Sequence, residues 1–396
     1  MEQVEVKCPG CGAEYSLPKD YWDKNAVCPA CETSFYVAPP GETAGLGDWQ
    51  PGEVLLDDFV VEGLLGEGGM GKVYLLRSRS TGSQFAVKRA KGLEEADRRN
   101  FLTELQTWID LPEHANLVPC RFFRTMGEEI LIFAEYVEGG SLSQWIQNRK
   151  LYEGGHQDAL KRILDVAIQF AWGLHCVHEQ GVIHQDVKPA NVMMTPDGTA
   201  KISDFGLSKA RPRISQSAIV DGKQSVLVSS GWMTPQYCSP EQAKGQPLSR
   251  KTDIWSWGVS VLEMFNGEVT WHSGQMATET LEEYLREREH DDLIPAMPAG
   301  VVEVLGACFQ RNPAKRWVNL ADVVEKLKEA YWKATSADYS PELAGIERRV
   351  SLKTGIEERC GRDGATWRSP RNWLEAALRV TGDVPADAAA LLDKHG

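Results

Sequence analysis

Four cysteines near the N-terminus have the type and spacing of a metal site. Cys8 and Cys11 form one Cys-x-x-Cys pair, Cys28 and Cys31 form a second, and sixteen residues separate the pairs. A two-residue gap lets both thiolates of a pair reach one ion, and four thiolates make the tetrahedral site that Zn²⁺ prefers. The segment between the pairs is too short and polar to bury a core, so zinc would supply most of its folding free energy. The sequence therefore predicts a structural zinc module over residues 1–37.

Two other interpretations of these cysteines are a disulfide pair and a redox-active Cys-x-x-Cys. Neither is typical of a cytosolic chain with two pairs at this spacing. The stretch resembles the short zinc ribbons at the start of some bacterial regulatory proteins, which implies a bacterial source. The spacing does not identify a partner. Nucleic acid is a poor candidate, because Lys7, Lys19 and Lys24 stand among acidic residues.

A glycine-rich segment, LLGEGGMGKVYLL over residues 64–76, contains Gly66, Gly68 and Gly71. Three kinds of phosphate-binding loop share such a pattern. A dinucleotide-binding turn needs a helix after the loop, but the residues that follow Gly71 are β-prone. A P-loop needs Ser or Thr after its Lys, where this chain has Val73. A hairpin that closes over ATP phosphates accommodates this valine, which would cover the adenine.

Charged and amide residues follow the loop in a fixed order. A lysine ends the strand-like AVK, a glutamate lies in the helical stretch NFLTELQTWIDL, and the segments HQDVKPAN and DFG come later. In chain order the set is Lys88, Glu104, Asp186, Lys188, Asn191 and Asp204. On these residues and spacings the chain resembles the eukaryotic-like (Hanks-type) serine/threonine protein kinases.

The resemblance implies ATP as phosphoryl donor, a protein as acceptor, and Mg²⁺ or Mn²⁺ as the metal. Asp186 would orient the acceptor hydroxyl and take its proton, and Lys188 would neutralise charge on the transferring group. Asn191 and Asp204 would hold the metal through oxygen atoms, which hard cations require. Lys188, two residues after Asp186, favours Ser/Thr over Tyr as acceptor.

The nucleotide would lie between the glycine loop and a hinge. Lys88 would hold the α and β phosphates, and an ion pair with Glu104 would fix its ammonium group. Ala134 precedes the expected hinge at the gatekeeper position, which usually carries a larger side chain. The residues implied to bind ATP are Gly66, Gly68, Gly71, Val73, Ala86, Lys88, Ala134, Glu135, Val137 and Met193.

Further motifs extend the resemblance toward the C-terminus. The triplet Ser-Pro-Glu ending at Glu241 stands where the family has Ala-Pro-Glu, and the resemblance implies an ion pair of Glu241 with Arg316. The segment DIWSWG resembles the buried helix whose aspartate, here Asp253, pins the catalytic loop.

Gln185 departs from the family, which usually has Arg before the catalytic Asp. That Arg grips a phosphorylated residue of the activation segment, and Gln offers no charged fork. We therefore hypothesise that phosphorylation of this segment is not the main switch, unless another arginine such as Arg211 or Arg213 takes the role. Several serines in the segment leave autophosphorylation open.

Strand-like patterns followed by helical ones over residues 58–332 predict the α+β class. The expected architecture is a two-lobed protein kinase fold, with a β-rich N-lobe and a helical C-lobe, after the four-cysteine ribbon. Residues 38–57, rich in Pro and Gly, are expected to form a linker. Residues 333–396 are expected to form a helical or partly disordered tail of unknown role.

The composition excludes several other classes of protein. The 396 residues carry a net charge of −13, which argues against a general nucleic-acid or membrane-surface binder. We see neither a membrane-span pattern nor a signal peptide, so we expect a cytoplasmic protein. A pseudokinase or signalling scaffold that binds ATP and a partner is the alternative function, and the ribbon or the tail could bind a protein partner.

A methyl group at Ala134 should open a pocket behind the adenine. We expect bulky adenine-like inhibitors to bind unusually well, and Ala134→Met to raise their half-inhibitory concentration by about tenfold or more, which is ~1.4 kcal/mol. The measurement is inhibitor titration of phosphorylation at fixed ATP concentration. Equal potency against both forms would contradict this expectation.

Overall fold

A computed structural model describes residues 3–8, 12–21, 24–31, 34–37, 48–68, 71–90, 101–102, 105–126, 129–205, 219–220, 223–224, 234–286 and 291–340. The chain divides into two compact units, Met1–Ile346 and Glu347–Gly396, and every described residue belongs to the first. Most of the expected tail therefore lies outside the described residues. Within the described residues, no helix is long and apolar enough to cross a membrane.

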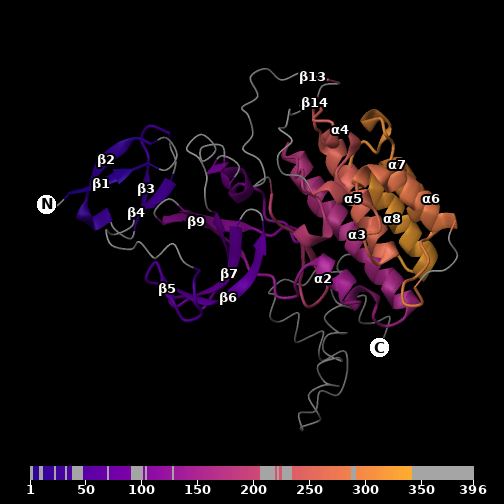
Figure 1. Cartoon of the computed structure of the whole chain (residues 1–396), viewed down its shortest axis with the longest axis horizontal. Helices are drawn as coiled ribbons and strands as arrows, with labels where there is room; N and C mark the ends of the chain where they lie inside the picture. The colour runs from indigo at the N-terminus through magenta and orange to yellow at the C-terminus, as the bar shows by residue number, and fades with distance from the viewer. Residues whose placement is uncertain are drawn as a thin grey trace, which may run out of the picture. The chain divides into compact units, whose positions relative to one another are not determined.

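The N-terminal module consists of two antiparallel hairpins (Figure 1). Cys8 directly follows the first strand and Cys28 directly follows the third, so each hairpin carries a thiol at a strand end. These two cysteines pack with Ala26 and Val37, and Val6, Tyr15 and Leu17 lie against this small cluster. The strands are β1 (Gln3–Lys7), β2 (Glu14–Pro18), β3 (Lys24–Val27) and β4 (Ser34–Val37).

A six-stranded antiparallel sheet follows, with strand order β5-β6-β7-β8-β10-β9. Its outer face is covered by aromatic side chains, among which Phe122 and Phe133 stack with ring centroids 4.6 Å apart. The strands are β5 (Val54–Leu55), β6 (Phe59–Gly68), β7 (Gly71–Ser78), β8 (Gln84–Ala90), β9 (Cys120–Met126) and β10 (Glu129–Glu135). Residues 101–102 and 105–109 are helical.

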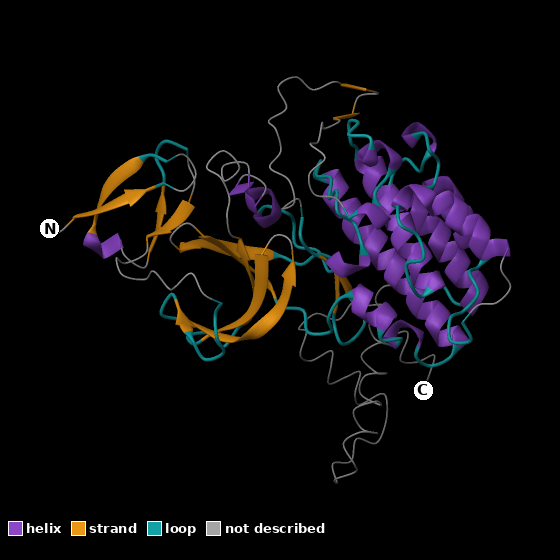
Figure 2. Cartoon of the chain, viewed as in Figure 1, coloured by secondary structure: helices purple, strands orange, loops and turns teal. Residues whose placement is uncertain are grey.

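The rest of the described chain is mainly helical, as Figure 2 shows. The helix α5 (Arg250–Asn266) is buried on nearly all sides, which marks it as the core of this region. The long α3 (His156–Glu179) packs against α5 and α8. The other helices are α2 (Leu142–Gln147), α4 (Pro240–Ala243), α6 (Ala277–Arg286), α7 (Ala299–Cys308) and α8 (Leu320–Thr335). The predicted α+β class with a β-rich lobe and a helical lobe is confirmed.

Short elements line the helical lobe where the chain leaves the sheet. The strands β11 (Val192–Met194) and β12 (Ala200–Ile202) form a hairpin that is bonded to the segment before β9. The N–H of Val118 donates to the backbone oxygen of Ile202 at 2.8 Å. The remaining short strands are β13 (Ile219–Val220) and β14 (Lys223–Gln224), and the 3-10 turns are η1 (Lys19–Tyr21), η2 (Lys150–Tyr152), η3 (Pro189–Asn191), η4 (Pro235–Tyr237), η5 (Gly274–Met276) and η6 (Pro313–Lys315).

The last residues of the expected linker, 38–57, belong to the core of the sheet. Trp49, Leu55 and Leu56 are buried in the same apolar cluster as Val61 and Tyr74. The Pro- and Gly-rich composition of the linker concealed these three apolar residues, which have no periodic neighbours in the sequence.

Candidate active site

Three polar side chains meet around the carboxylate of Asp186. Lys188 Nζ lies 2.8 Å from Asp186 Oδ2, and Thr234 Oγ1 donates to Asp186 Oδ1 at 2.9 Å. Asn191 Nδ2 donates to the backbone oxygen of Asp186 at 2.8 Å and to its Oδ2 at 3.0 Å. Lys188 Nζ also donates to Thr234 Oγ1 at 2.7 Å. The carboxylate is held on both oxygens, so its orientation is fixed.

A single 3-10 turn brings Asn191 back toward Asp186. Pro189 begins this turn, where its fixed φ angle fits and its missing N–H is not needed. Ser203 then donates to the backbone oxygen of Asn191, from its N–H at 2.9 Å and from its Oγ at 3.1 Å. Because Ser203 immediately precedes Asp204, the two predicted metal ligands are held together, one just before β11 and the other just after its partner strand β12.

Lys88 on β8 forms an ion pair with Asp204 across the two lobes. The distance from Lys88 Nζ to Asp204 Oδ1 is 3.0 Å. Burial acts to raise the pKa of Asp204, but the charge and hydrogen bond of Lys88 together with the charges of His184 and Lys188 lower that pKa below its usual range. Asp204 is therefore a carboxylate at neutral pH, the form in which it can hold a metal ion.

The buried Asp253 on α5 holds the start of the predicted catalytic loop. Its Oδ2 accepts hydrogen bonds from His178 Nε2 and from the N–H of His184, and its Oδ1 accepts one from the N–H of Gln185, each at 2.8 Å. The predicted pinning contact is therefore present. His178, a buried residue of α3, is thus a further partner of this carboxylate.

Gln185 occupies a strained and buried position. Its φ angle is +69°, which for a non-glycine residue costs of order 1–3 kcal/mol. Gln242 Nε2 donates to its backbone oxygen at 2.8 Å, while its side-chain oxygen has no hydrogen-bond partner within the described part of the chain. The backbone is therefore held in place by contacts on both sides, and the side chain adds no charge. Arg211 and Arg213 lie outside the described residues.

The glycine-rich segment is a hairpin between two strands. Gly66 pairs with Val73, and Gly68 pairs with Gly71 at the end of β6 and β7. The φ angle of Gly71 is +123°, and a Cβ there would lie 2.1 Å from the backbone oxygen of Arg89. Only glycine fits at this position. Since a strand rather than a helix follows the loop, the dinucleotide-binding and P-loop interpretations are both excluded.

Strand register puts the expected adenine contacts on adjacent strands. Val73 on β7 lies opposite Lys88 on β8, which relates the two predicted nucleotide contacts directly. Ala86 lies opposite both Leu75 on β7 and Ala134 on β10. The small side chains of Ala86 and Ala134 therefore stand side by side in the middle of the sheet.

The expected hinge leaves the sheet at the end of β10. The carboxylate of Glu135, its first residue, pairs with Lys201 Nζ at 2.7 Å, so this side chain is occupied by a lysine of β12. Val137 is buried, and Met193 on β11 forms an isolated backbone bridge with Ser141 just after the hinge. The predicted hinge residues and Met193 of the predicted nucleotide site thus lie next to one another.

Glu104, the expected partner of Lys88, lies outside the described residues, as does Gly206 of the DFG motif. The neighbouring helical residue Trp108 is described. Its ring packs 5.9 Å from that of Phe205, and its Nε1 donates to Val118 O at 2.9 Å. The residue after Asp204 is therefore in contact with the helical residues 105–109.

The predicted ion pair of Glu241 with Arg316 is present and buried. Arg316 contacts Glu241 through both terminal nitrogens, at 2.7 and 2.8 Å. Burial acts to raise the pKa of Glu241, and the hydrogen bonds and charge of Arg316 lower it below its usual range. The pair joins the start of α4 to the chain before α8.

Another buried carboxylate, which the sequence reasoning missed, lies beside the segment that carries Thr234. Tyr237 OH donates to Glu263 Oε2 at 2.6 Å. Burial raises the pKa of Glu263 to about 7, and the hydrogen bond from Tyr237 opposes this only in part. The sequence gives no signal for this pair, because the contact depends on burial that only the folded chain creates.

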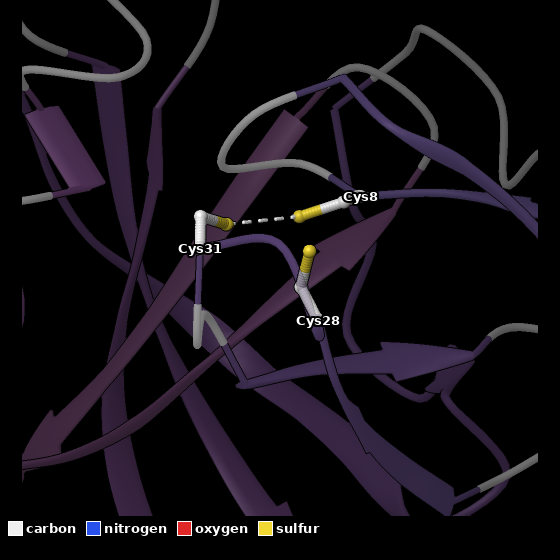
Figure 3. A group of neighbouring side chains, drawn as sticks. All are labelled: Cys8, Cys28 and Cys31. Carbon is white, nitrogen blue, oxygen red and sulfur yellow. Dashed lines mark hydrogen bonds between the residues drawn. The ribbon is translucent and has the colours of Figure 1, made fainter.

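Three of the four predicted zinc ligands come together (Figure 3). The sulfur atoms of Cys8, Cys28 and Cys31 lie within 4.8 Å of one another, and those of Cys8 and Cys31 are 3.6 Å apart. Cys11 lies outside the described residues. Burial acts to raise the pKa of Cys28, and hydrogen bonds, first of all from Tyr15, lower it to about 6. Converging thiols, one of which has a lowered pKa, are a donor set that suits zinc.

Residues 59–332 match the protein kinase domain family. Among similar proteins, MAP kinase kinase kinase mkh1 of Schizosaccharomyces pombe is 30% identical over 262 residues, which are 63% of this chain and 22% of that protein. Cytokinesis protein sepH of Aspergillus niger is 30% identical over 283 residues, 70% of this chain and 19% of that protein. Serine/threonine-protein kinase BCK1/SLK1/SSP31 of Saccharomyces cerevisiae is 29% identical over 264 residues, 64% of this chain and 17% of that protein.

Because the family match covers more than half of the chain, this chain belongs to the protein kinase family. It spans about a fifth of the length of the relatives named above. Those relatives are fungal, so they do not support the bacterial source that the ribbon implies. The family match begins at residue 59, after the N-terminal cysteine module.

The raised pKa of Glu263 predicts a pH-dependent contribution to stability. A carboxyl group with a pKa of about 7 in the folded state and an ordinary value in the unfolded state binds its proton more tightly when folded. Its stabilisation is complete at low pH and is lost as pH rises toward 7. The free energy of unfolding of the wild type should therefore fall relative to that of Glu263→Gln by on the order of 2–3 kcal/mol between pH 4.5 and 7.5.

Denaturant unfolding of both proteins at several pH values measures this difference. Tyr237→Phe serves as a matched control, because it removes the donor that opposes the pKa shift and should move the transition to higher pH. A difference between wild type and Glu263→Gln that stays constant across this pH range would contradict the assignment.

Proposed function

We propose that this chain transfers the γ-phosphoryl group of ATP to serine or threonine hydroxyls of proteins. The observation that carries the proposal is the cluster in which Lys188, Asn191 and Thr234 all contact Asp186. This arrangement leaves one oriented carboxylate beside one lysine, which suits a base that accepts a proton while the neighbouring charge stabilises a phosphoryl group.

The nucleotide phosphates are held by the lobe that carries the glycine hairpin. Lys88 contacts the α and β phosphates, and the proposed ion pair with Glu104 fixes its ammonium group. The loop from Gly66 to Gly71 covers the phosphates with backbone N–H groups. Adenine packs between Val73 and Ala86 above and Met193 below, and hydrogen-bonds to the backbone between Glu135 and Val137.

Asp204 and Asn191 are the residues that would hold Mg²⁺ or Mn²⁺. Asp204 is ionised at neutral pH, and the amide nitrogen of Asn191 is already used by Asp186. The carbonyl oxygen of the Asn191 side chain is thus the atom suited to a hard cation. When bound, the metal would neutralise charge on the β and γ phosphates.

In the transfer itself, the acceptor hydroxyl oxygen forms a bond to the γ phosphorus while the bond to the β–γ bridging oxygen breaks. The hydroxyl proton passes to a carboxylate oxygen of Asp186, and ADP leaves. Lys188 stays beside the transferring group and offsets its negative charge. The products are a phosphorylated serine or threonine and ADP. Serines of the chain's own activation segment are acceptors of the same kind, so autophosphorylation belongs to the proposal.

Control of this activity is proposed to differ from that of family members with an Arg before the catalytic Asp. Gln185 is buried and neutral, and its backbone is held by Asp253 and Gln242. These contacts need no phosphate group. Phosphorylation of the activation segment is therefore not the main switch in this proposal.

The N-terminal module is proposed to be a zinc ribbon with Cys8, Cys11, Cys28 and Cys31 as ligands. The close approach of three thiols and the low pKa of Cys28 support it. Its role would be structural, and the module or the tail would bind a protein partner.

Asp186→Asn should lower the turnover number by about 10²–10⁴-fold, because the amide cannot accept the hydroxyl proton. Binding of Mg-ATP, measured by calorimetry, should persist, since Asp186 contacts the acceptor. The control is Asp197→Asn in the turn between β11 and β12, which makes the same chemical change and should leave phosphorylation intact. A wild type without activity that still binds Mg-ATP would support the pseudokinase alternative.

Complete dephosphorylation should leave most of the activity, within about twofold, because Gln185 offers no charged fork to a phosphate. The initial rate of phosphorylation is measured before and after phosphatase treatment, with mass spectrometry to verify removal. Heat-inactivated phosphatase is the control. Collapse of the rate after true dephosphorylation would contradict the proposed mode of control.

Native mass spectrometry should find one zinc ion per chain, since four thiolates at this spacing form one tetrahedral site. Cys28→Ser should abolish it, while Cys176→Ser on α3 should leave it bound. Zinc removal should raise amide hydrogen exchange in residues 3–37 but not in α5, because metal binding supplies the folding free energy of the module. A metal-free chain with a protected module would rule out structural zinc.

A further inference from the structure

Asp48 and Trp49, which precede the first strand of the sheet, contact the outer face of the glycine hairpin. Trp49 is only 5% exposed, and its ring centroid lies 4.7 Å from that of Tyr74 on β7. The guanidinium carbon of Arg89 on β8 lies 4.9 Å from the Trp49 ring centroid. Asp48 Oδ2 lies 2.6 Å from Lys72 Nζ. We call Asp48 and Trp49 the N-terminal clamp.

Strand register connects the clamp to the predicted nucleotide site. Lys72 and Arg89 are direct cross-strand partners, and the next pair along the same two strands is Val73 and Lys88. Successive side chains of a strand point to opposite faces of a sheet. The clamp therefore contacts Lys72 and Arg89 on the outer face of the sheet. The adjacent pair, Val73 and Lys88, points to the opposite face, where the nucleotide is proposed to bind.

Arg89 links the clamp to the base of the glycine loop. Its side chain is 1% exposed and forms an ion pair with Glu129. Its backbone oxygen lies so close to Gly71 that a Cβ on this glycine would be 2.1 Å away. A shift of Arg89 would therefore move the residue at which the loop re-enters β7.

We propose that Asp48 and Trp49 are positioning residues that fix the glycine loop and Lys88 for binding of the ATP phosphates. The inference rests on the proposed kinase function. The contacts of Trp49 and Asp48 contribute unequally to this positioning. Trp49 is buried between an aromatic ring and a cation, while the ion pair of Asp48 is partly exposed and screened by solvent. Trp49 is the main element of the clamp, and Asp48 adds a smaller contribution.

The experiment uses the full chain and compares Trp49→Ala with Trp49→Phe. Loss of the ring should raise the KM for ATP and the Kd for Mg-ATP by roughly fivefold or more, with a smaller change in kcat, because the phosphate contacts lose their fixed geometry. Phenylalanine keeps a ring against Tyr74 and Arg89. It also loses no hydrogen bond, because the indole N–H of Trp49 has no partner within the described residues. Trp49→Phe should therefore restore most of the affinity.

A matched control separates positioning from loss of stability. Phe122→Leu removes a ring from the same apolar cluster, but on the edge strand β9 and away from the Lys72–Arg89 pair. It should lower the melting temperature without changing the KM for ATP. For the smaller contact, Asp48→Lys should weaken Mg-ATP binding by about twofold, and the charge-reversed double variant Asp48→Lys with Lys72→Asp should restore it.

Three outcomes would overturn the inference. In the first, Trp49→Ala lowers the melting temperature yet binds Mg-ATP with unchanged affinity. In the second, Phe122→Leu raises the KM for ATP as much as Trp49→Ala does, which would make the effect one of general stability. In the third, the wild type binds no Mg-ATP at all, which would remove the proposed function together with the inference.

Discussion

A single buried carboxylate organises the catalytic half of the molecule. Asp253 has no exposed surface, and three hydrogen bonds replace the water that it loses. Burial acts to raise its pKa, but the hydrogen bond and charge of His178, together with His184 and the N–H of Gln185, lower that pKa below its usual range. A buried charge is costly unless donors surround it, so this site tolerates only the backbone path that brings those donors together.

The consequences extend outward from that contact. The two N–H groups that bind Asp253 belong to the residues immediately before Asp186, so the position of α5 sets the position of the carboxylate proposed to be the catalytic base. His184 also contacts the backbone oxygen of Ser203, next to Asp204. The helical core thus orders both halves of the predicted site, and Lys88 reaches Asp204 from the other lobe.

Much of this arrangement could be predicted from sequence, because motifs with fixed chemistry need fixed neighbours. The glycine hairpin followed from the β-prone residues after Gly71, while the contacts of Asp253 and the pairing of Glu241 with Arg316 followed from the family resemblance. Trp49 could not be found in this way, because a lone aromatic in a Pro- and Gly-rich stretch has no periodic partners. Glu263 was equally hidden, since its pKa depends on burial that only the folded packing around α5 creates.

The neutral side chain of Gln185 has a consequence for how the proposed activity is controlled. An arginine at this place would be a buried cation awaiting a counter-charge, and its loop would be incomplete until that charge arrived. Glutamine carries no charge, so the folded loop needs no counter-charge at this position. Under the proposed function the enzyme would then be constitutively competent, and its cellular activity would scale with abundance and with access to acceptors.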